Sequence, residues 1–307
     1  MRRALLLLAS LLALQARAAT YYVTVSGLGG EPDYEQRFAA EAKDLDKVFK
    51  AGGSAAQVYT LSGTQATAAQ LKETLATVAR SAKPEDDFVL ILIGHGSFDN
   101  VEYKFNLVGP DLTGAEIAAL CDRVPARRQL VVVATSASGG ALAALERTGR
   151  GVIAATKSGT EKNAVVFGRY WVEALQDSAA DTDKSDAVSA MEAFTYATKK
   201  TAAFYDSQKR IATEHAVFDD IGRGEAVREA GGGQGTLMSN FTVLRLGASQ
   251  QAANDPARRA LLAKKEELEQ KIDMLKYQKA AMDPQDYRKQ LTDALVELAK
   301  TQQELDK

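Results

Sequence analysis

The fold is decided by two apolar runs that end in glycine and polar residues: FVLILIGHGS (residues 88–97) and LVVVATSASGG (residues 130–140). Each run is apolar at successive positions rather than at alternate ones, which is typical of strands buried on both faces of a parallel sheet. Parallel strands end at the same edge of a sheet, and ligands of open α/β folds bind there. The sequence therefore predicts that His95, after the first run, and Ser136, after the second, lie near each other.

Strand and helix patterns alternate around these two runs. Apolar alternation predicts further strands, and helical spacing predicts the connections between them. The predicted strands are 21–25, 56–61, 151–156 and 241–246, with a short strand or hairpin at 103–108, and the predicted helices are 35–49, 67–79, 114–124, 165–175 and 188–205. This order implies right-handed crossovers, so we expect an α/β fold, a three-layer α/β/α sandwich with a mostly parallel sheet.

The amino terminus has the pattern of a secretory signal peptide. Two arginines precede the apolar run Ala4 to Leu14, and Ala16 and Ala18 offer small residues for cleavage. The run is shorter than the roughly 20 residues of a membrane-spanning helix. We therefore expect residues 1–19 to be removed and the protein to be exported, either periplasmic or secreted, with no membrane attachment after cleavage.

Charge and cysteine content narrow the classes of partner. A formal net charge of −2 gives no reason to expect nucleic acid. Cys121, the only cysteine, cannot form an internal disulfide, and its spacing from Ile117 and Val124 is that of a helix core face, so we expect it to be buried rather than catalytic. The glycines that follow the first strand do not match the dinucleotide-binding fingerprint, so nucleotide binding is not expected.

The carboxyl-terminal region is separable from the predicted sheet domain, residues 20–246. A polar linker is predicted at 247–255, followed at 256–307 by two helices that start at Asp255-Pro256 and Asp283-Pro284. Four-three spacing predicts an antiparallel coiled-coil hairpin, with Leu261, Leu268, Ile272, Leu275 and Met282 on one helix and Tyr287, Leu291, Ala294, Leu298 and Leu305 on the other. Its seam could close on itself, on the sheet domain or on another chain, so association through these helices stays open.

His95 and Ser136 are the candidate catalytic residues. An imidazole and a hydroxyl on neighbouring strand ends are the groups that a base and a nucleophile require. The backbone N–H groups of Gly96 and Ser136 could then stabilise an oxyanion. The alternative interpretation is that Thr135, Ser136 and Ser138 cap the helix that starts near Gly140.

The acidic loop 181–192 is a second candidate site. Oxygen-bearing side chains occupy positions one, three, five, nine and twelve of a calcium loop of the EF-hand type; they are Asp181, Asp183, Ser185, Ser189 and Glu192. Asp186 stands at the sixth position, where that loop has glycine, and Ser189 with Glu192 also has the pattern of a helix capping box. Calcium is the one cofactor that the sequence suggests. The other histidine, His215, has no cysteine partner for zinc.

The two strand ends carry a resemblance to a known family. A strand that ends in His95-Gly96, followed by a strand and a turn with Ser138-Gly139, resembles the legumain branch of the clan CD cysteine peptidases, relatives of the caspases. The likeness runs from about Thr20 to Gly224 and includes the segments 154–156 and 192–194. It implies a caspase/legumain-like sheet, with the catalytic histidine at His95 and the nucleophile at Ser136.

The sequence departs from that family at the nucleophile. Ser136 stands where the family has cysteine, and Ala134 where legumains have glutamate. A serine hydroxyl needs a well-oriented base, whereas a thiol supplies some thiolate at neutral pH. The resemblance therefore favours a catalytically impaired, exported peptidase-fold protein that binds a peptide or protein. The alternative is an active endopeptidase that uses His95 and Ser136.

Overall fold

The computed structural model describes residues 18–52, 56–223, 225–255 and 257–306. The predicted signal peptide falls almost entirely in residues 1–17, outside this part of the chain. Within the described ranges, none of the helices is long and apolar enough to cross a membrane.

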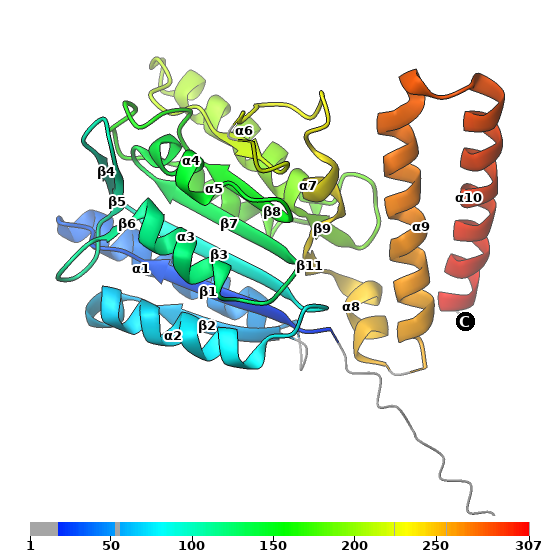
Figure 1. Ribbon diagram of the computed structural model, residues 1–307, viewed down its shortest axis with the longest axis horizontal. Helices are drawn as coiled ribbons and strands as arrows, with labels where there is room; N and C mark the ends of the chain where they lie inside the picture. The colour runs from blue at the N-terminus through cyan, green and yellow to red at the C-terminus, as the bar shows by residue number, and fades with distance from the viewer. Residues whose placement is uncertain (1–17, 53–55, 224, 256, 307) are drawn as a thin grey trace, which may run out of the picture.

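A six-stranded sheet forms the centre of the molecule (Figure 1). Its order is β10-β8-β7-β3-β1-β2, and every neighbouring pair is parallel except β10 with β8. The strands are β1 (Thr20–Ser26), β2 (Ala56–Leu61), β3 (Asp87–Gly94), β7 (Arg128–Thr135), β8 (Arg150–Ala154) and β10 (Val217–Asp219). The two runs that decide the fold are thus adjacent central strands, β3 and β7.

Helices cover both faces of this sheet. One face packs on α1 (Pro32–Lys50), α5 (Phe167–Ala174) and α6 (Ala190–Ser207), and the other on α2 (Ala68–Ser81), α3 (Gly114–Asp122) and α4 (Leu142–Leu145). Alternate residues of β3 enter the two cores: Val89, Ile91 and Ile93 in one, and Phe88, Leu90 and Leu92 in the other. Burial on both faces explains the continuous apolar runs and confirms the predicted three-layer sandwich.

Two smaller, separate sheets lie at opposite ends of the strands of the central sheet. Beyond the carboxyl end of β3, an antiparallel sheet is formed by β4 (Gly96–Phe98), β5 (Tyr103–Phe105) and β6 (Leu112–Thr113). At the opposite end, β9 (Ala187–Ser189) pairs with β11 (Thr242–Arg245), next to α7 (Thr236–Asn240). Arg128, the first residue of β7, donates to the Asn240 carbonyl there (3.1 Å). The predicted strand at 241–246 therefore lies outside the main sheet.

The polar stretch expected as a linker is instead a helix, α8 (Gly247–Asn254). Its sequence contains alanine and glutamine, which favour helix, and Ala252 packs with Leu262 and Leu305 in a small apolar cluster. Two longer helices follow, α9 (Arg259–Gln278) and α10 (Pro284–Leu305), and they form the predicted hairpin. The cap at Asp283 is confirmed, because its carboxylate accepts from two backbone N–H groups of the first turn.

The buried stripe of α9 differs from the predicted seam. It consists of Leu262, Lys265, Leu268, Ile272 and Leu275, because α9 packs on α7 and α8 as well as on α10. Leu262 rather than Leu261 is therefore fully buried. Lys265 is tolerated in this stripe because its ammonium donates to the Ser185 carbonyl at 2.8 Å. The seam closes both on itself and on the sheet domain.

Replacing Ile272 by alanine should test this packing. The side chain is 6% exposed, so its truncation should lower the free energy of unfolding by about 2 kcal/mol. Met274 on the same helix is 45% exposed, and Met274→Ala should change it by less than about 0.5 kcal/mol. Urea denaturation of the two variants provides the measurement, and equal losses would contradict the buried stripe.

Candidate functional site

The register of β3 and β7 brings the predicted pair together. Gly94 pairs with Thr135 as the last partners of the two strands, so His95 and Ser136 follow side by side at the carboxyl edge. The strand ends thus place an imidazole and a hydroxyl where the sequence predicted them. The two side chains, however, contact different residues.

The Ser136 hydroxyl is bonded to the backbone of Gly96. Its Oγ accepts from the Gly96 N–H (3.1 Å) and donates to the Gly96 carbonyl (3.0 Å). The residue is 2% exposed. An added Cβ at Gly96 would lie 2.7 Å from the Ser136 carbonyl oxygen, so glycine is required for this close approach. The Gly96 N–H already donates to the Ser136 hydroxyl. It could donate to an oxyanion only after this hydrogen bond is broken.

His95 points towards the amino-terminal part of α1. Its ring makes edge contacts with Tyr34 (4.8 Å between centroids) and Phe38 (5.2 Å). Burial lowers the pKa of His95, the Arg37 guanidinium lowers it further, and the Gly29 carbonyl opposes them. No carboxylate orients this ring among the hydrogen bonds of the described residues. His95 therefore lacks the third group that a serine nucleophile uses.

The turn after Ser136 is held in an unusual conformation. Ala137 has φ +56°, in the left-handed region that non-glycine residues seldom adopt. On one side, the Thr135 hydroxyl bonds to Tyr103 (2.7 Å). On the other, Ser138 and Thr156 share a hydrogen bond (3.1 Å). The alternative reading of Ser136 as a helix cap finds no support, since the short helical turn that begins at Ser138 has no side-chain cap.

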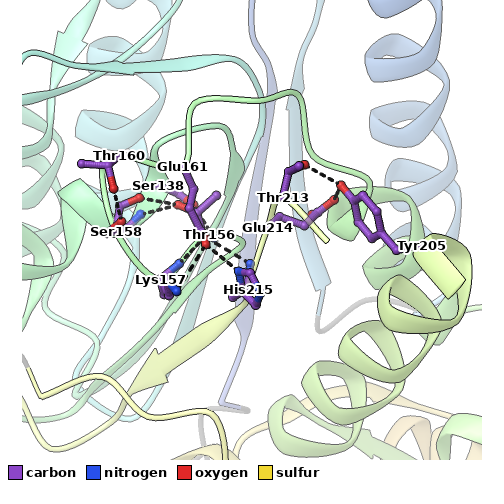
Figure 2. Close-up of polar contacts among 11 residues, drawn as sticks. Ser138, Thr156, Lys157, Ser158, Thr160, Glu161, Tyr205, Thr213, Glu214 and His215 are labelled. Atoms are coloured by element: carbon purple, nitrogen blue, oxygen red, sulfur yellow. Dashed lines mark hydrogen bonds and ion pairs between the residues drawn. The ribbon is translucent and has the colours of Figure 1, made fainter. Parts of the chain in front are cut away.

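A carboxylate does orient the other histidine. Nδ1 of His215 lies 2.5 Å from Oε1 of Glu161, and the His215 backbone N–H bonds to the same carboxylate at 3.1 Å (Figure 2). The main-chain carbonyl of Glu161 accepts from Ala137 N–H at 2.8 Å, directly after Ser136. This pair, contributed by the loop after β8 and the segment before β10, is part of the same edge of the sheet.

Glu214, the neighbour of His215, points the other way. Its carboxylate accepts from the N–H groups of Val166 and Phe167 at the start of α5 (2.8 and 3.0 Å) and from the Tyr205 hydroxyl (2.9 Å). Burial raises the pKa of Glu214 in spite of these hydrogen bonds. Segment 213–215 is thus fixed to the molecule from both sides, as Figure 2 shows.

The acidic loop forms the predicted capping box. Ser189 and Glu192 exchange hydrogen bonds at the start of α6. The carboxylates of Asp181, Asp183 and Glu192 gather within 4.8 Å of one another. They also accept hydrogen bonds from backbone N–H groups of their own loop: the Ser185 N–H donates to both aspartates, and the Thr182 N–H donates to Glu192. The loop thus has a structural explanation without a metal, and calcium binding stays a prediction.

Cys121 lies in the core, as expected. It is 0% exposed, and burial raises the pKa of its thiol to about 11. A thiol in this state supplies almost no thiolate at neutral pH.

Comparison with known proteins yields structural neighbours alone. No family model and no curated protein matches the chain. Its structural neighbours include caspases. The Drosophila initiator caspase Dronc is 12% identical, with 73% of this chain and 84% of that chain covered and a TM-score of 0.44. Caspase-1 from Spodoptera frugiperda is 11% identical, with coverage of 67% and 86% and a TM-score of 0.46. A protein from Geobacter sulfurreducens is 13% identical, with coverage of 60% and 89% and a TM-score of 0.42. At these TM-scores the likenesses carry no argument about function.

The Glu161–His215 pair was not predicted from the sequence. The two residues are 54 positions apart, and neither belongs to a short motif. One signal was present: Thr213-Glu214-His215 lies just before the apolar residues Ala216, Val217 and Phe218. An additional strand there would have placed His215 at the same edge as Ser136.

Proposed function

We propose that this protein is an exported member of the legumain/caspase-like peptidase fold that is catalytically impaired and acts by binding a peptide or protein at the carboxyl edge of its sheet. The surface concerned comprises the strand ends at His95 and Ser136 and the loops around them.

The hydrogen bonds of Ser136 carry this proposal. Its hydroxyl donates to the Gly96 carbonyl, so its proton is directed away from any base. The His95 ring packs against Tyr34 and Phe38. A serine nucleophile depends on a base that accepts its proton, and this arrangement does not provide one.

Exposed apolar side chains at the same edge support binding of a peptide or protein. Leu28 (42% exposed) follows β1, Val101 (89%) lies in the β4–β5 connection, and Ile211 (90%) lies between α6 and β10. The first and third segments join the main sheet at its carboxyl edge, and the second belongs to the small sheet beyond that edge. A peptide bound there would meet apolar side chains, and burial of apolar surface favours binding.

Selection from a random peptide library provides the test. We expect peptides selected on the full mature chain to bind at least tenfold more weakly to the double variant Val101→Asp/Ile211→Asp. Leu295 is 48% exposed on α10, and Leu295→Asp is the matched control that should leave binding unchanged. A fluorophosphonate probe should not label Ser136.

Two results would contradict this function. Peptide binding that is equal in the double variant and the control would place the ligand elsewhere. Labelling of Ser136 by the fluorophosphonate, lost in His95→Ala, would instead establish an active serine hydrolase and hence the endopeptidase alternative.

A further inference from the structure

The Ser136 turn rests directly on the loop that follows β8. Ala137 N–H donates to the Glu161 carbonyl (2.8 Å), and Gly139 N–H donates to the Thr156 hydroxyl (2.9 Å). A Cβ added at Gly139 would lie 2.2 Å from the backbone nitrogen of Ser158. The turn and the loop are therefore in backbone contact, and a shift of one requires a shift of the other.

The Glu161 side chain links this loop to the segment that carries His215. Its carboxylate accepts from the Lys157 N–H (3.0 Å), the His215 N–H (3.1 Å) and His215 Nδ1 (2.5 Å). The side chain is 12% exposed, and its two bonds to His215 are part-buried, whereas the bond from Lys157 is exposed. Glu161, whose carbonyl accepts from the Ala137 N–H, is thus held by His215 together with the contacts that it makes to Lys157 and Ser158 within its own loop.

The segment that carries His215 is also held by contacts on either side of this residue in the sequence. The segment is anchored through Glu214 to the start of α5, and it continues into β10, where Val217 pairs with Ala154. The His215 ring is 28% exposed, and its Nε2 has no hydrogen-bond partner within the described part of the chain. The imidazole therefore presents one nitrogen to Glu161 and the other outwards.

The turn needs such support because its backbone is strained. The left-handed conformation of Ala137 is unfavourable for a residue with a Cβ atom and persists only where the surroundings impose it. Its N–H bond to the Glu161 carbonyl is one of the contacts that impose it. Weakening the Glu161–His215 pair should therefore loosen the turn before it loosens the rest of the domain.

We infer that Glu161 and His215 are positioning residues for Ser136. The pair keeps the turn in the conformation that buries the hydroxyl against Gly96, and a ligand that contacts the exposed face of the His215 ring would act on Ser136 through Glu161. This inference rests on the proposed function in that the Ser136 edge is taken as the ligand-binding site.

Alkylation of a cysteine at position 136 provides the test. In the Ser136→Cys protein, mapping of the peptides modified by iodoacetamide reports Cys121 and the new thiol separately. Cys121 is wholly buried, so it reacts only on global unfolding. Adding His215→Ala or Glu161→Gln should raise the alkylation rate at position 136 at least tenfold while Cys121 stays unmodified. His215→Asn should keep the parent rate, because its amide N–H replaces Nδ1–H towards Glu161.

The outcomes separate positioning from other roles. A rate at position 136 within twofold of the parent in His215→Ala would overturn the inference. Equal acceleration at both cysteines would also overturn it, since the pair would then stabilise the whole fold. If Glu161→Gln does not fold, the comparison of His215→Ala with His215→Asn decides alone. Peptide binding plays no part in this readout, so the proposed function can fail while the inference holds, and the reverse.

Discussion

Gln129→Leu is expected to lower the free energy of unfolding by about 4 kcal/mol, although it conserves volume and adds apolar surface. The Gln129 amide is 1% exposed and donates to the carbonyls of Cys121 and Val124, both at 3.1 Å. Its oxygen accepts from Nε of Arg150 at 2.9 Å. Leucine would leave the Val124 carbonyl and Nε–H of the buried Arg150 without these hydrogen bonds, and the Cys121 carbonyl would keep only its bond from the Val124 N–H.

The double variant Gln129→Leu/Arg150→Met is the informative control. It removes the buried cation together with its partner, so we expect it to recover a substantial part of the loss, as replacement of a whole buried polar pair often does. Urea unfolding followed by circular dichroism measures both proteins. A loss below about 1 kcal/mol in the single variant would show that water or a local rearrangement satisfies these groups.

Glu41→Gln is expected to stabilise the protein at pH 8 by up to about 3 kcal/mol and to have little effect at pH 4.5. Glu41 lies on the inner face of α1, and its side chain is 10% exposed. Burial raises its pKa from 4.5 to about 7, against the lowering effect of Arg37, whose Nε lies 3.7 Å away. The folded protein therefore binds this proton more tightly than the unfolded chain does.

The sign of the pH dependence follows from that difference. The stabilisation due to protonated Glu41 is complete below pH 4.5 and is lost as the pH rises towards 7. Glutamine carries no charge at either pH, so the variant should escape the loss. Glu73→Gln, at an exposed carboxyl of α2, is the matched control, and its stability curve should run parallel to that of the wild type. Stability curves of Glu41→Gln and wild type that run parallel from pH 4.5 to 8 would refute the prediction.

The central strands could be predicted because strands that are buried on both faces have uninterrupted apolar sequences. The runs that became β3 and β7 have such sequences over six and four residues. Strands β4 and β10 have three residues each, too few to show a period, so they were missed. Once these two strands are taken as parallel neighbours that end at the same level of the sheet, His95 is expected beside Ser136, as the observed register shows.

Side-chain partners were less predictable than strand positions. The sequence placed an imidazole and a hydroxyl at one edge, but the ring contacts of His95 and the bonds of Ser136 to Gly96 depend on ring orientation and loop path. The capping box at Ser189 was predictable because its partner is three residues away. The Glu161–His215 pair joins two loops distant in sequence, and only the assembled sheet brings them together.

The helical hairpin lies at the opposite end of the sheet from the Ser136 edge (Figure 1). Arg128 at the amino end of β7 reaches the segment beside α7, and Arg245 of β11 forms an ion pair with Glu266 of α9 at 2.7 Å. A molecule tethered through α10 would therefore turn its strand ends outwards. Immobilisation through the carboxyl terminus should therefore leave the edge that we propose as the binding site accessible.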